Sequence, residues 1–289
     1  MKFGTVCIIG PGLIGGSVGL GLKKKNLAKT IVGVGHRTSS LEKATKMHAI
    51  DIGTLNSEEA VKDADIVILA TSVNKIIDTA KKIIPFMKRN AILTDVGSTK
   101  KYIVEQISHN IRKDITFVGA HPIAGSEQRG VEFASADLFE GCTCIITPID
   151  NHTAEVETIS HLWRLLGAKI TYLTPEQHDE ILAFVSHLPH LVASCLINAI
   201  KKEHLVCGAS GLSDTTRIAS GDPELWMHIF DQNRENIIKS IDLFITELGG
   251  FRNDLLNKNN AKILDRLKNA KLSRDSVFHN NSTNKNTNK

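Results

Sequence analysis

Short apolar runs rich in β-branched residues alternate with amphipathic stretches along the first half of the chain. The apolar runs are Val6–Ile9, Ile31–Val34, Ile66–Ala70, Ala91–Asp95, Phe117–Ala120 and Cys142–Thr147. Between them, apolar residues recur at helical spacing over Gly10–Leu22, Asn74–Met87 and Thr99–Ile111. This alternation is typical of parallel strands joined by crossover helices. We therefore predict an α/β domain with one doubly wound sheet over residues 1–150.

The pattern changes after Pro148, where helical spacing dominates. Helices are expected over Thr153–Leu166, Pro175–His204 and Trp226–Leu248, with one strand-like run at Ala168–Leu173. We therefore predict an all-helical second domain over residues 151–272. Residues 273–289 are polar and rich in Asn and Lys, so a disordered tail is expected there.

The charge balance limits the classes of partner. The 35 basic and 31 acidic residues give a net charge of +4, and 42% of the residues are hydrophobic, enough for a sizeable core. Neither nucleic-acid nor membrane binding is expected from so balanced a chain, whereas small anionic molecules are mildly favoured.

The cysteines and the N-terminus bear on location. The chain has five cysteines, Cys7, Cys142, Cys144, Cys195 and Cys207, and none of them form a CxxC pair, which indicates free thiols in a reducing compartment. The N-terminal MKFGTVCIIG lacks a basic region followed by a long apolar core, and no segment of membrane-spanning length is evident. A cytoplasmic protein is expected.

The most specific local motif is IIGPGLIGGSVG, which follows a predicted strand and opens a predicted helix. In this context Gly10 permits a tight turn, Gly12 lets the backbone approach a pyrophosphate, and Gly15 allows close packing of helix and strand. The helix N-terminus, with Leu13 and Ile14, supplies amide donors. A Rossmann domain that binds a dinucleotide is predicted; the alternative is a glycine-rich turn without a ligand.

The end of the second predicted strand bears on which dinucleotide is bound. An NAD site usually places a carboxylate about 20 residues past the glycines, but here Gly35 is followed by His36 and Arg37. Because no carboxylate repels a 2′-phosphate, Arg37 and His36 tilt the prediction for an NAD(P) cofactor towards NADP over NAD. Arg37 as a solvated residue, or stacked on adenine in an NAD complex, is the alternative. Thr71 and Ser72, after another strand, are further candidates for cofactor binding.

Two polar motifs follow later strands of the predicted sheet, where ligands bind in this architecture. In TDVGSTK, Ser98 can either cap the next helix or offer its hydroxyl to a substrate. In the long loop that starts GAHPIAGSEQRG, His121 precedes Pro122 and is therefore held in an extended conformation at the strand end. We interpret His121 as a catalytic acid–base residue, with a structural histidine as the alternative.

The predicted helical domain contains SHLPH and GLSDTTRIASGDPELW. His187 and His190 have the spacing of a metal pair, but no third ligand is evident and no metal is predicted. Arg217 is a candidate for gripping a carboxylate, since guanidinium forms two parallel bonds to a planar anion. An ion pair with Asp214 or Asp222 is the alternative for Arg217.

Taken in order, GPGLIGGS, DVGSTK, GAHPIAGSEQRG, SHLPH and SDTTRIASGDPELW resemble the motif series of the prephenate/arogenate dehydrogenase family, from Val6 to about Leu248. The resemblance implies oxidative decarboxylation of prephenate or arogenate in tyrosine biosynthesis, a helical domain that forms a homodimer, and active sites between domains. It also implies roles for individual residues: His121 and Ser98 in catalysis, and His190, Arg217 and Trp226 in substrate binding. Gly125 and Ser126, in the loop after His121, are further candidates for substrate binding from their position.

The chain also departs from the family pattern. Ser213, a further candidate for substrate binding, stands where many members have a cationic residue. This leaves open whether the pyruvyl side chain of prephenate or the alanyl side chain of arogenate is bound. The length leaves no room for a fused mutase domain, so a monofunctional enzyme is expected. Two other classes stay open: a β-hydroxyacid dehydrogenase, for which Lys201 or Lys202 would have to supply the catalytic lysine, and a non-catalytic NAD(P)-binding sensor.

Overall fold

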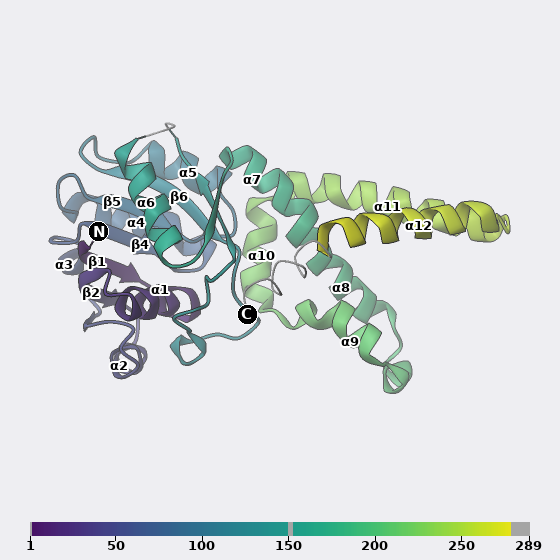
Figure 1. The fold of residues 1–289 in the computed structure, drawn as a ribbon, viewed down its shortest axis with the longest axis horizontal. Coiled ribbons are helices and arrows are strands. Elements are labelled where there is room, and N and C mark those ends of the chain that lie inside the picture. The colour runs from purple at the N-terminus through teal and green to yellow at the C-terminus, as the bar shows by residue number, and fades with distance from the viewer. Residues whose placement is uncertain (1, 150–152, 279–289) are drawn as a thin grey trace, which may run out of the picture. The chain divides into compact units, whose positions relative to one another are not determined.

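A computed structural model describes residues 2–149 and 153–278 of the chain (Figure 1). The chain divides into two compact units, one up to Ile237 and one from Ile238 onwards. The first unit contains a sheet, its covering helices and a helical segment that packs on the sheet's helices. The second unit is a pair of long helices.

The sheet has eight strands in the order β3-β2-β1-β4-β5-β6-β7-β8. Their bounds are β1 Phe3–Ile9, β2 Ala28–Val34, β3 Ile52–Thr54, β4 Ile66–Leu69, β5 Ile92–Asp95, β6 Thr116–Pro122, β7 Thr143–Thr147 and β8 Lys169–Tyr172. The predicted Rossmann architecture followed by an all-helical part is confirmed. The carboxyl ends of β1, β4 and β5, which are parallel to one another, lie at one edge of the sheet.

One strand direction was not predicted. β7 pairs antiparallel with β6, with His121 opposite Ile145, whereas the sequence pattern predicts parallel strands throughout. The segment between these strands contains only the short 3-10 helix Val131–Phe133. Without a crossover helix the chain has no connection that would return it parallel to β6, so an antiparallel pair results.

Helices cover both faces of the sheet. They are α1 Leu13–Lys24, α2 Thr38–Lys46, α3 Ser57–Ala60, α4 Val73–Ile83, α5 Lys101–Ser108 and α6 Ala154–Leu165, with a 3-10 turn at Ile84–Phe86. Side chains of β1 alternate between two cores: Val6 and Ile8 pack with α1, α2 and α6, while Cys7 and Ile9 pack with α4 and α5. Burial on both faces explains why the strands are continuously apolar. β3, α2 and α3 were not predicted; all three are short, and β3 and most of α2 are exposed.

The predicted domain boundary at residue 150 falls inside the sheet-bearing part. β8 pairs with β7, and α6, which lies between these two strands in the sequence, packs on the sheet. The sheet therefore ends at Tyr172. The strand-like run at 168–173 is thus an edge strand of the first domain. Its alternation is weak because Lys169 and Tyr172 are exposed.

The helical segment of the first unit begins at Pro175, after a capping box in which Thr174 and Gln177 satisfy each other's backbone amides. Its elements are α7 Pro175–Leu182, a π-helical turn Ala183–His187, α8 Leu188–Ala199, a 3-10 helix Lys202–Cys207, α9 Ser210–Thr216, a 3-10 helix Arg217–Ser220 and α10 Pro223–Gln232. By length and composition alone the run Pro175–Ala199 could cross a membrane, so the prediction that no segment has that length is wrong. A single such helix is weak evidence for a membrane span, and this one contains buried polar side chains.

The second unit consists of most of α11, Arg234–Leu256, together with α12, Asn260–Phe278. Arg266 of α12 joins Asp254 at 2.9 Å and Glu247 at 2.6 Å, both on α11. The predicted disordered tail from 273 is wrong for residues 273–278, which continue α12. A Lys271–Asp275 ion pair one turn apart supports that polar helix. The rest of the predicted tail, 279–289, lies outside the described residues.

Candidate active site

The glycine-rich turn between β1 and α1 fits a dinucleotide. Gly10 has φ +93°, and a Cβ there would lie 2.7 Å from the carbonyl oxygen of Ala70. A Cβ on Gly15 would lie 2.3 Å from the oxygen of Gly10. At Gly12 a Cβ would have no described atom within 4 Å. Two of the glycines are therefore needed by the fold, and the third lines open space beside the amides of the first turn of α1, where a pyrophosphate would bind.

Other predicted cofactor residues border this turn. Thr71 follows β4, its methyl carbon would lie 3.2 Å from a Cβ on Gly10, and its hydroxyl oxygen is buried without a partner among the described residues. Ser72 donates to Asn74 Oδ1 at 2.8 Å. His36 and Arg37 are exposed just after β2, with Arg37 at the N-cap of α2. All of them lie at the carboxyl ends of adjacent parallel strands.

A buried ion pair underlies the turn after β5. Lys100 and Asp95 are both fully buried, and Lys100 Nζ donates to Asp95 Oδ2 at 2.6 Å. The remaining ammonium protons reach the carbonyl oxygens of Gly97 at 2.7 Å and Thr99 at 3.1 Å. Asp95 also accepts from the amides of Gly97 at 2.9 Å and Ala120 at 3.2 Å. Full pairing of this kind offsets much of the cost of burying two charges.

Ser98 lies partly buried within this same turn. It does not cap α5, because the N-cap position is Lys100 and no side chain caps the helix locally. The capping alternative for Ser98 is therefore wrong. Its hydroxyl stays a candidate for contacting a substrate.

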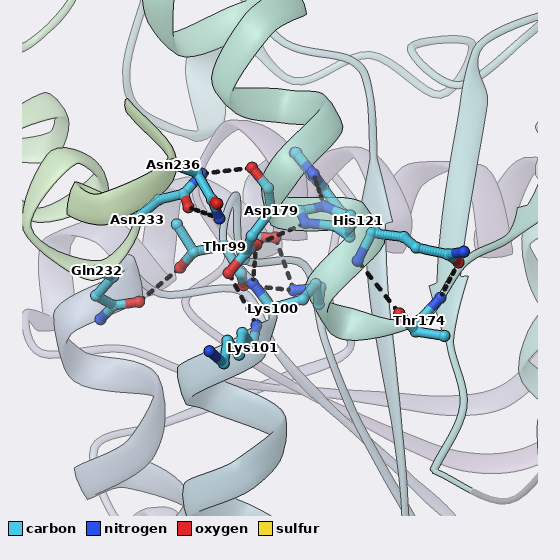
Figure 2. A network of polar contacts seen from close by, with 12 residues as sticks. Thr99, Lys100, Lys101, His121, Thr174, Asp179, Gln232, Asn233 and Asn236 are labelled. Carbon is cyan, nitrogen blue, oxygen red and sulfur yellow. Dashed lines mark hydrogen bonds and ion pairs between the residues drawn. The ribbon is translucent and has the colours of Figure 1, made fainter. Parts of the chain in front are cut away.

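His121 lies near the end of β6 and begins a chain of hydrogen bonds (Figure 2). Its Nδ1 lies 2.8 Å from Nε2 of His178, and Nδ1 of His178 lies 2.8 Å from Oδ1 of Asp179. Asp179 in turn accepts from the backbone amides of Lys100 at 2.8 Å and Lys101 at 3.0 Å. The carboxylate of α7 thus satisfies amides at the N-terminus of α5, where the helix dipole favours negative charge.

Burial decides the protonation of these groups. It lowers the pKa of His121 well below 6.5, and the nearby His178, Lys100 and His187 lower it further. Burial likewise lowers the pKa of His178 to about 2. Burial raises the pKa of Asp179, although the two backbone amides and Lys100 oppose that rise. The His178–Asp179 contact is therefore the hydrogen bond of a neutral imidazole, not an ion pair.

The helical segment presents an aromatic wall. His190 is stacked on Trp226 with ring centroids 3.7 Å apart and an interplanar angle of 16°. Nδ1 of His190 is buried without a hydrogen-bond partner among the described residues, and burial lowers its pKa. A Cβ on Gly221 would lie 2.5 Å from Trp226 Nε1, so only glycine lets the backbone approach this ring. Asn233 bridges the segment by donating to the backbone oxygen of Asp179 at 2.7 Å and contacting His187 Nδ1 at 3.1 Å.

The loop after β6 makes two ion pairs with the helical segment. Glu127 joins Arg217 at 3.2 Å, and Arg129 joins Asp222 at 2.6 Å. The predicted alternative partners of Arg217, Asp214 and Asp222, are wrong because Glu127 is its partner. Arg217 still has a side chain 63% exposed, which leaves its guanidinium accessible to an anion.

The remaining predicted substrate residues are exposed. Gly125 has φ +141° in the loop, where a side chain would be strained, and Ser126 accepts from the amide of Gln128 at 3.2 Å. Ser213 lies on α9. None of the three belongs to the hydrogen-bonded chain around His121. Over residues 2–149 and 153–278 no cluster of His, Cys, Asp and Glu side chains has the arrangement of a metal site.

Five residues of this site were not predicted from the sequence: Lys100, His178, Asp179, Asn233 and Glu127. The His178–Asp179 pair lies in the polar run Pro175–Glu180 at the start of α7, where no sequence pattern distinguishes these two buried residues from their exposed polar neighbours. Nothing local indicates that α7 lies over the carboxyl end of β6.

Models of known families match almost the whole chain. Residues 18–172 match the nucleotide-binding domain of prephenate dehydrogenase, and residues 174–269 match its dimerization domain. The chain belongs to the prephenate dehydrogenase family. The junction between the two matches falls between β8 and α7, which is also where the sheet ends. The chain is thus an oxidoreductase of this family, as the sequence motifs predict.

Relatives match this chain over nearly its whole length. The prephenate dehydrogenase of Bacillus subtilis is 32% identical over 281 residues, which cover 94% of this chain and 76% of the relative. The crystal structure of prephenate dehydrogenase from Aquifex aeolicus with hydroxyphenyl propionate and NAD+ is 32% identical, has a TM-score of 0.89 and covers 96% of this chain and 99% of that one. Arogenate dehydrogenase from Synechocystis is 28% identical, with a TM-score of 0.81 and coverage of 95% and 100%.

The buried imidazoles predict a pH dependence of stability. The pKa of His178 is about 2 and that of His187 about 4 in the fold, against about 6.5 in an unfolded chain. Below about pH 6.5 the unfolded chain binds protons that the native one does not, so the free energy of unfolding falls by up to about 1.4 kcal/mol per pH unit for each imidazole. Urea denaturation at about pH 7 and about pH 5 measures this fall. His187→Asn reduces the difference, and a stability independent of pH would contradict the assignment.

Proposed function

We propose that this chain is an NAD(P)-dependent dehydrogenase that oxidises and decarboxylates prephenate or arogenate. The observation that carries the proposal is the neutral His121 at the carboxyl end of β6, hydrogen-bonded on one nitrogen to His178. It lies in the same sheet as the glycine turn that fits a dinucleotide. An aromatic wall of His190 and Trp226 belongs to the helical segment packed on that sheet.

The ligands of the Aquifex aeolicus structure support this substrate class. Hydroxyphenyl propionate carries a hydroxyl at one end of a six-membered ring and a carboxylate at the other, as prephenate does. A pocket for such a molecule needs an acceptor for the hydroxyl, a flat apolar surface for the ring and a cation for the acid group. His121, Trp226 and Arg217 are residues of these types.

The proposed chemistry divides between these side chains. When bound, NAD(P)+ accepts the hydride. Neutral His121 takes the proton of the ring hydroxyl as that carbon becomes a carbonyl, and returns it to the same oxygen once loss of carbon dioxide makes the ring aromatic. Ser98 shares the hydroxyl contact. Arg217 grips the distant carboxylate, while His190 and Trp226 fix the plane of the ring. Loss of carbon dioxide and aromatisation drive the step, so alignment is the main task of the protein.

Two substitutions separate chemistry from binding. We expect His121→Asn to lower kcat by about 10²- to 10⁴-fold with little change in KM, because a general base is lost. Arg217→Ala should chiefly raise KM, because a binding contact is lost. The assay follows reduced nicotinamide and carbon dioxide with prephenate and with arogenate. Near-normal turnover by His121→Asn would exclude the proposed acceptor.

The same assay addresses the two other classes. A β-hydroxyacid dehydrogenase would need Lys201 or Lys202, yet both are exposed, at the start of a 3-10 helix. A non-catalytic sensor would bind the dinucleotide without turning over either cyclohexadienyl acid. Turnover of one of them by the purified protein excludes the sensor.

We also propose that NADP is preferred over NAD. Supporting this, His36 and Arg37 are exposed beside Gly35, where no carboxylate would repel a 2′-phosphate. A Cβ on Gly35 would lie 3.0 Å from Leu41, so a larger residue there is crowded.

The preference predicts a selective effect at one residue. Arg37→Ala should lower kcat/KM for NADP+ by about 10-fold or more, because a charge-assisted contact to phosphate is lost. Its kcat/KM for NAD+ should change little. Lys43→Ala, on the exposed face of α2, is the matched control for a lost positive charge. A wild-type enzyme with a strong preference for NAD+ would refute the proposal.

A homodimer is proposed from the exposed apolar surface of the second unit. Leu243, Ile245, Leu248, Leu255 and Leu256 of α11 are each between 57% and 64% exposed. Apolar patches of this kind mark subunit interfaces, and the family model for residues 174–269 is named for dimerization.

Sedimentation tests the homodimer. We expect the wild-type protein to sediment as a dimer and Leu248→Glu to shift it towards monomer, because a charge would be buried in the interface. Lys81→Glu on the exposed face of α4 should stay dimeric. A monomeric wild-type protein would exclude the proposal.

A cytoplasmic location is also proposed, supported by five cysteines that are all free thiols.

A further inference from the structure

The hydrogen-bonded chain behind His121 has a direction. A carboxylate can only accept hydrogen bonds, and Asp179 already accepts from two backbone amides, on Oδ1 from Lys100 at 2.8 Å and on Oδ2 from Lys101 at 3.0 Å. Oδ1 also lies 2.8 Å from Nδ1 of His178. The proton between them must therefore belong to Nδ1 of His178.

The next contact follows from the first. A neutral imidazole has one protonated nitrogen and one lone pair. Since Nδ1 of His178 holds the proton, its Nε2 is an acceptor, and it lies 2.8 Å from Nδ1 of His121. His121 must then donate from Nδ1, which leaves Nε2 of His121 with the free lone pair.

We propose that His178 and Asp179 are positioning residues that hold His121 in its Nδ1-protonated tautomer, so that Nε2 is the nitrogen that accepts the substrate's hydroxyl proton. The inference rests on the proposed function, since it assigns an orientation to the base of that reaction. In the reacting step the O–H bond breaks and an N–H bond forms at Nε2. The imidazolium so formed keeps its Nδ1–H bond to His178, with the charge of Asp179 beyond it.

The surroundings fix the chain in place. Both ends of Asp179 are held, its carboxylate by the N-terminus of α5 and its backbone oxygen by Asn233 Nδ2 at 2.7 Å. The backbone at Ala120, next to His121, is held by Asp95, which pairs with the buried Lys100. His178 is wholly buried, so water cannot replace a lost partner. These constraints leave the rings little freedom to turn over.

Neutron diffraction from crystals of the deuterated wild-type protein tests the assignment directly. We expect deuterium on Nδ1 of both His121 and His178, and none on Nε2 of either ring. Deuterium on Nε2 of His121 would overturn the inference. This measurement needs no turnover, so it gives an answer even if the proposed function is wrong.

Kinetics test whether the tautomer matters. Asp179→Asn places an amide that can donate to His178, which would reverse the chain and leave Nε2 of His121 protonated. We expect kcat to fall by about 10²- to 10⁴-fold, with KM and cofactor affinity within about 2-fold of wild type. His178→Leu should lose kcat similarly, because His121 Nδ1 loses its acceptor.

The conservative variant separates positioning from packing. The amide of His178→Gln can accept from His121 and donate to Asp179, so kcat should recover at least about 10-fold relative to His178→Leu. Thermal denaturation and dinucleotide binding check that each variant is folded. Equal losses in Gln and Leu variants that fold, or full activity of a folded Asp179→Asn, would overturn the positioning role. If the wild type turns over neither substrate, the proposed function fails instead.

Discussion

The rest of the site depends on the hydrogen bonds that the Asp179 carboxylate accepts. This carboxylate belongs to α7, in the helical segment, yet its hydrogen-bond donors are amides at the start of α5, in the sheet-bearing part. A buried carboxylate is tolerated only when its oxygens are fully paired, so α7 has little freedom to slide along α5 without leaving a charge unpaired. Through this contact the helix that supplies His178 is fixed over the end of the strand that supplies His121.

A buried charge pair, Lys100 with Asp95, extends the same constraint into the sheet. Its members bond to backbone groups of the turn after β5 and of β6, where hydrophobic residues of similar size would leave those groups unsatisfied. Buried polar networks specify one arrangement at a cost in stability. The Lys100–Asp95 pair thus costs stability but fixes the geometry where the turn bearing Ser98 meets the strand bearing His121.

What the sequence could predict follows from the range of each interaction. Gly10 and Gly15 are constrained by neighbours within a few residues or by one adjacent strand, so the motif identifies them. The Pro122 that follows His121 likewise fixes the His121 backbone locally. The partners of His121 and Arg217 come from other elements, His178 from α7 and Glu127 from the loop after β6, and no periodicity links them. The reversed direction of β7 and the polar helix at 273–278 were missed for a related reason. Both depend on what a segment packs against or pairs with, which the local apolar pattern does not specify.

The division of the site between sheet and helices has a mechanistic consequence. The glycine turn and His121 both lie on one sheet, so their spacing is set by strand pairing, which is rigid. The residues that orient the imidazole and flank the ring, His178, His190 and Trp226, all come from α7, α8 and α10. Any displacement of these helices would change the direction of the His121 ring and the plane of the substrate together. Asp179 ties α7 to α5, and Gln232 at the end of α10 bonds to Thr99 and to the backbone of Val73. The base is therefore correctly oriented only while the helical wall is in place.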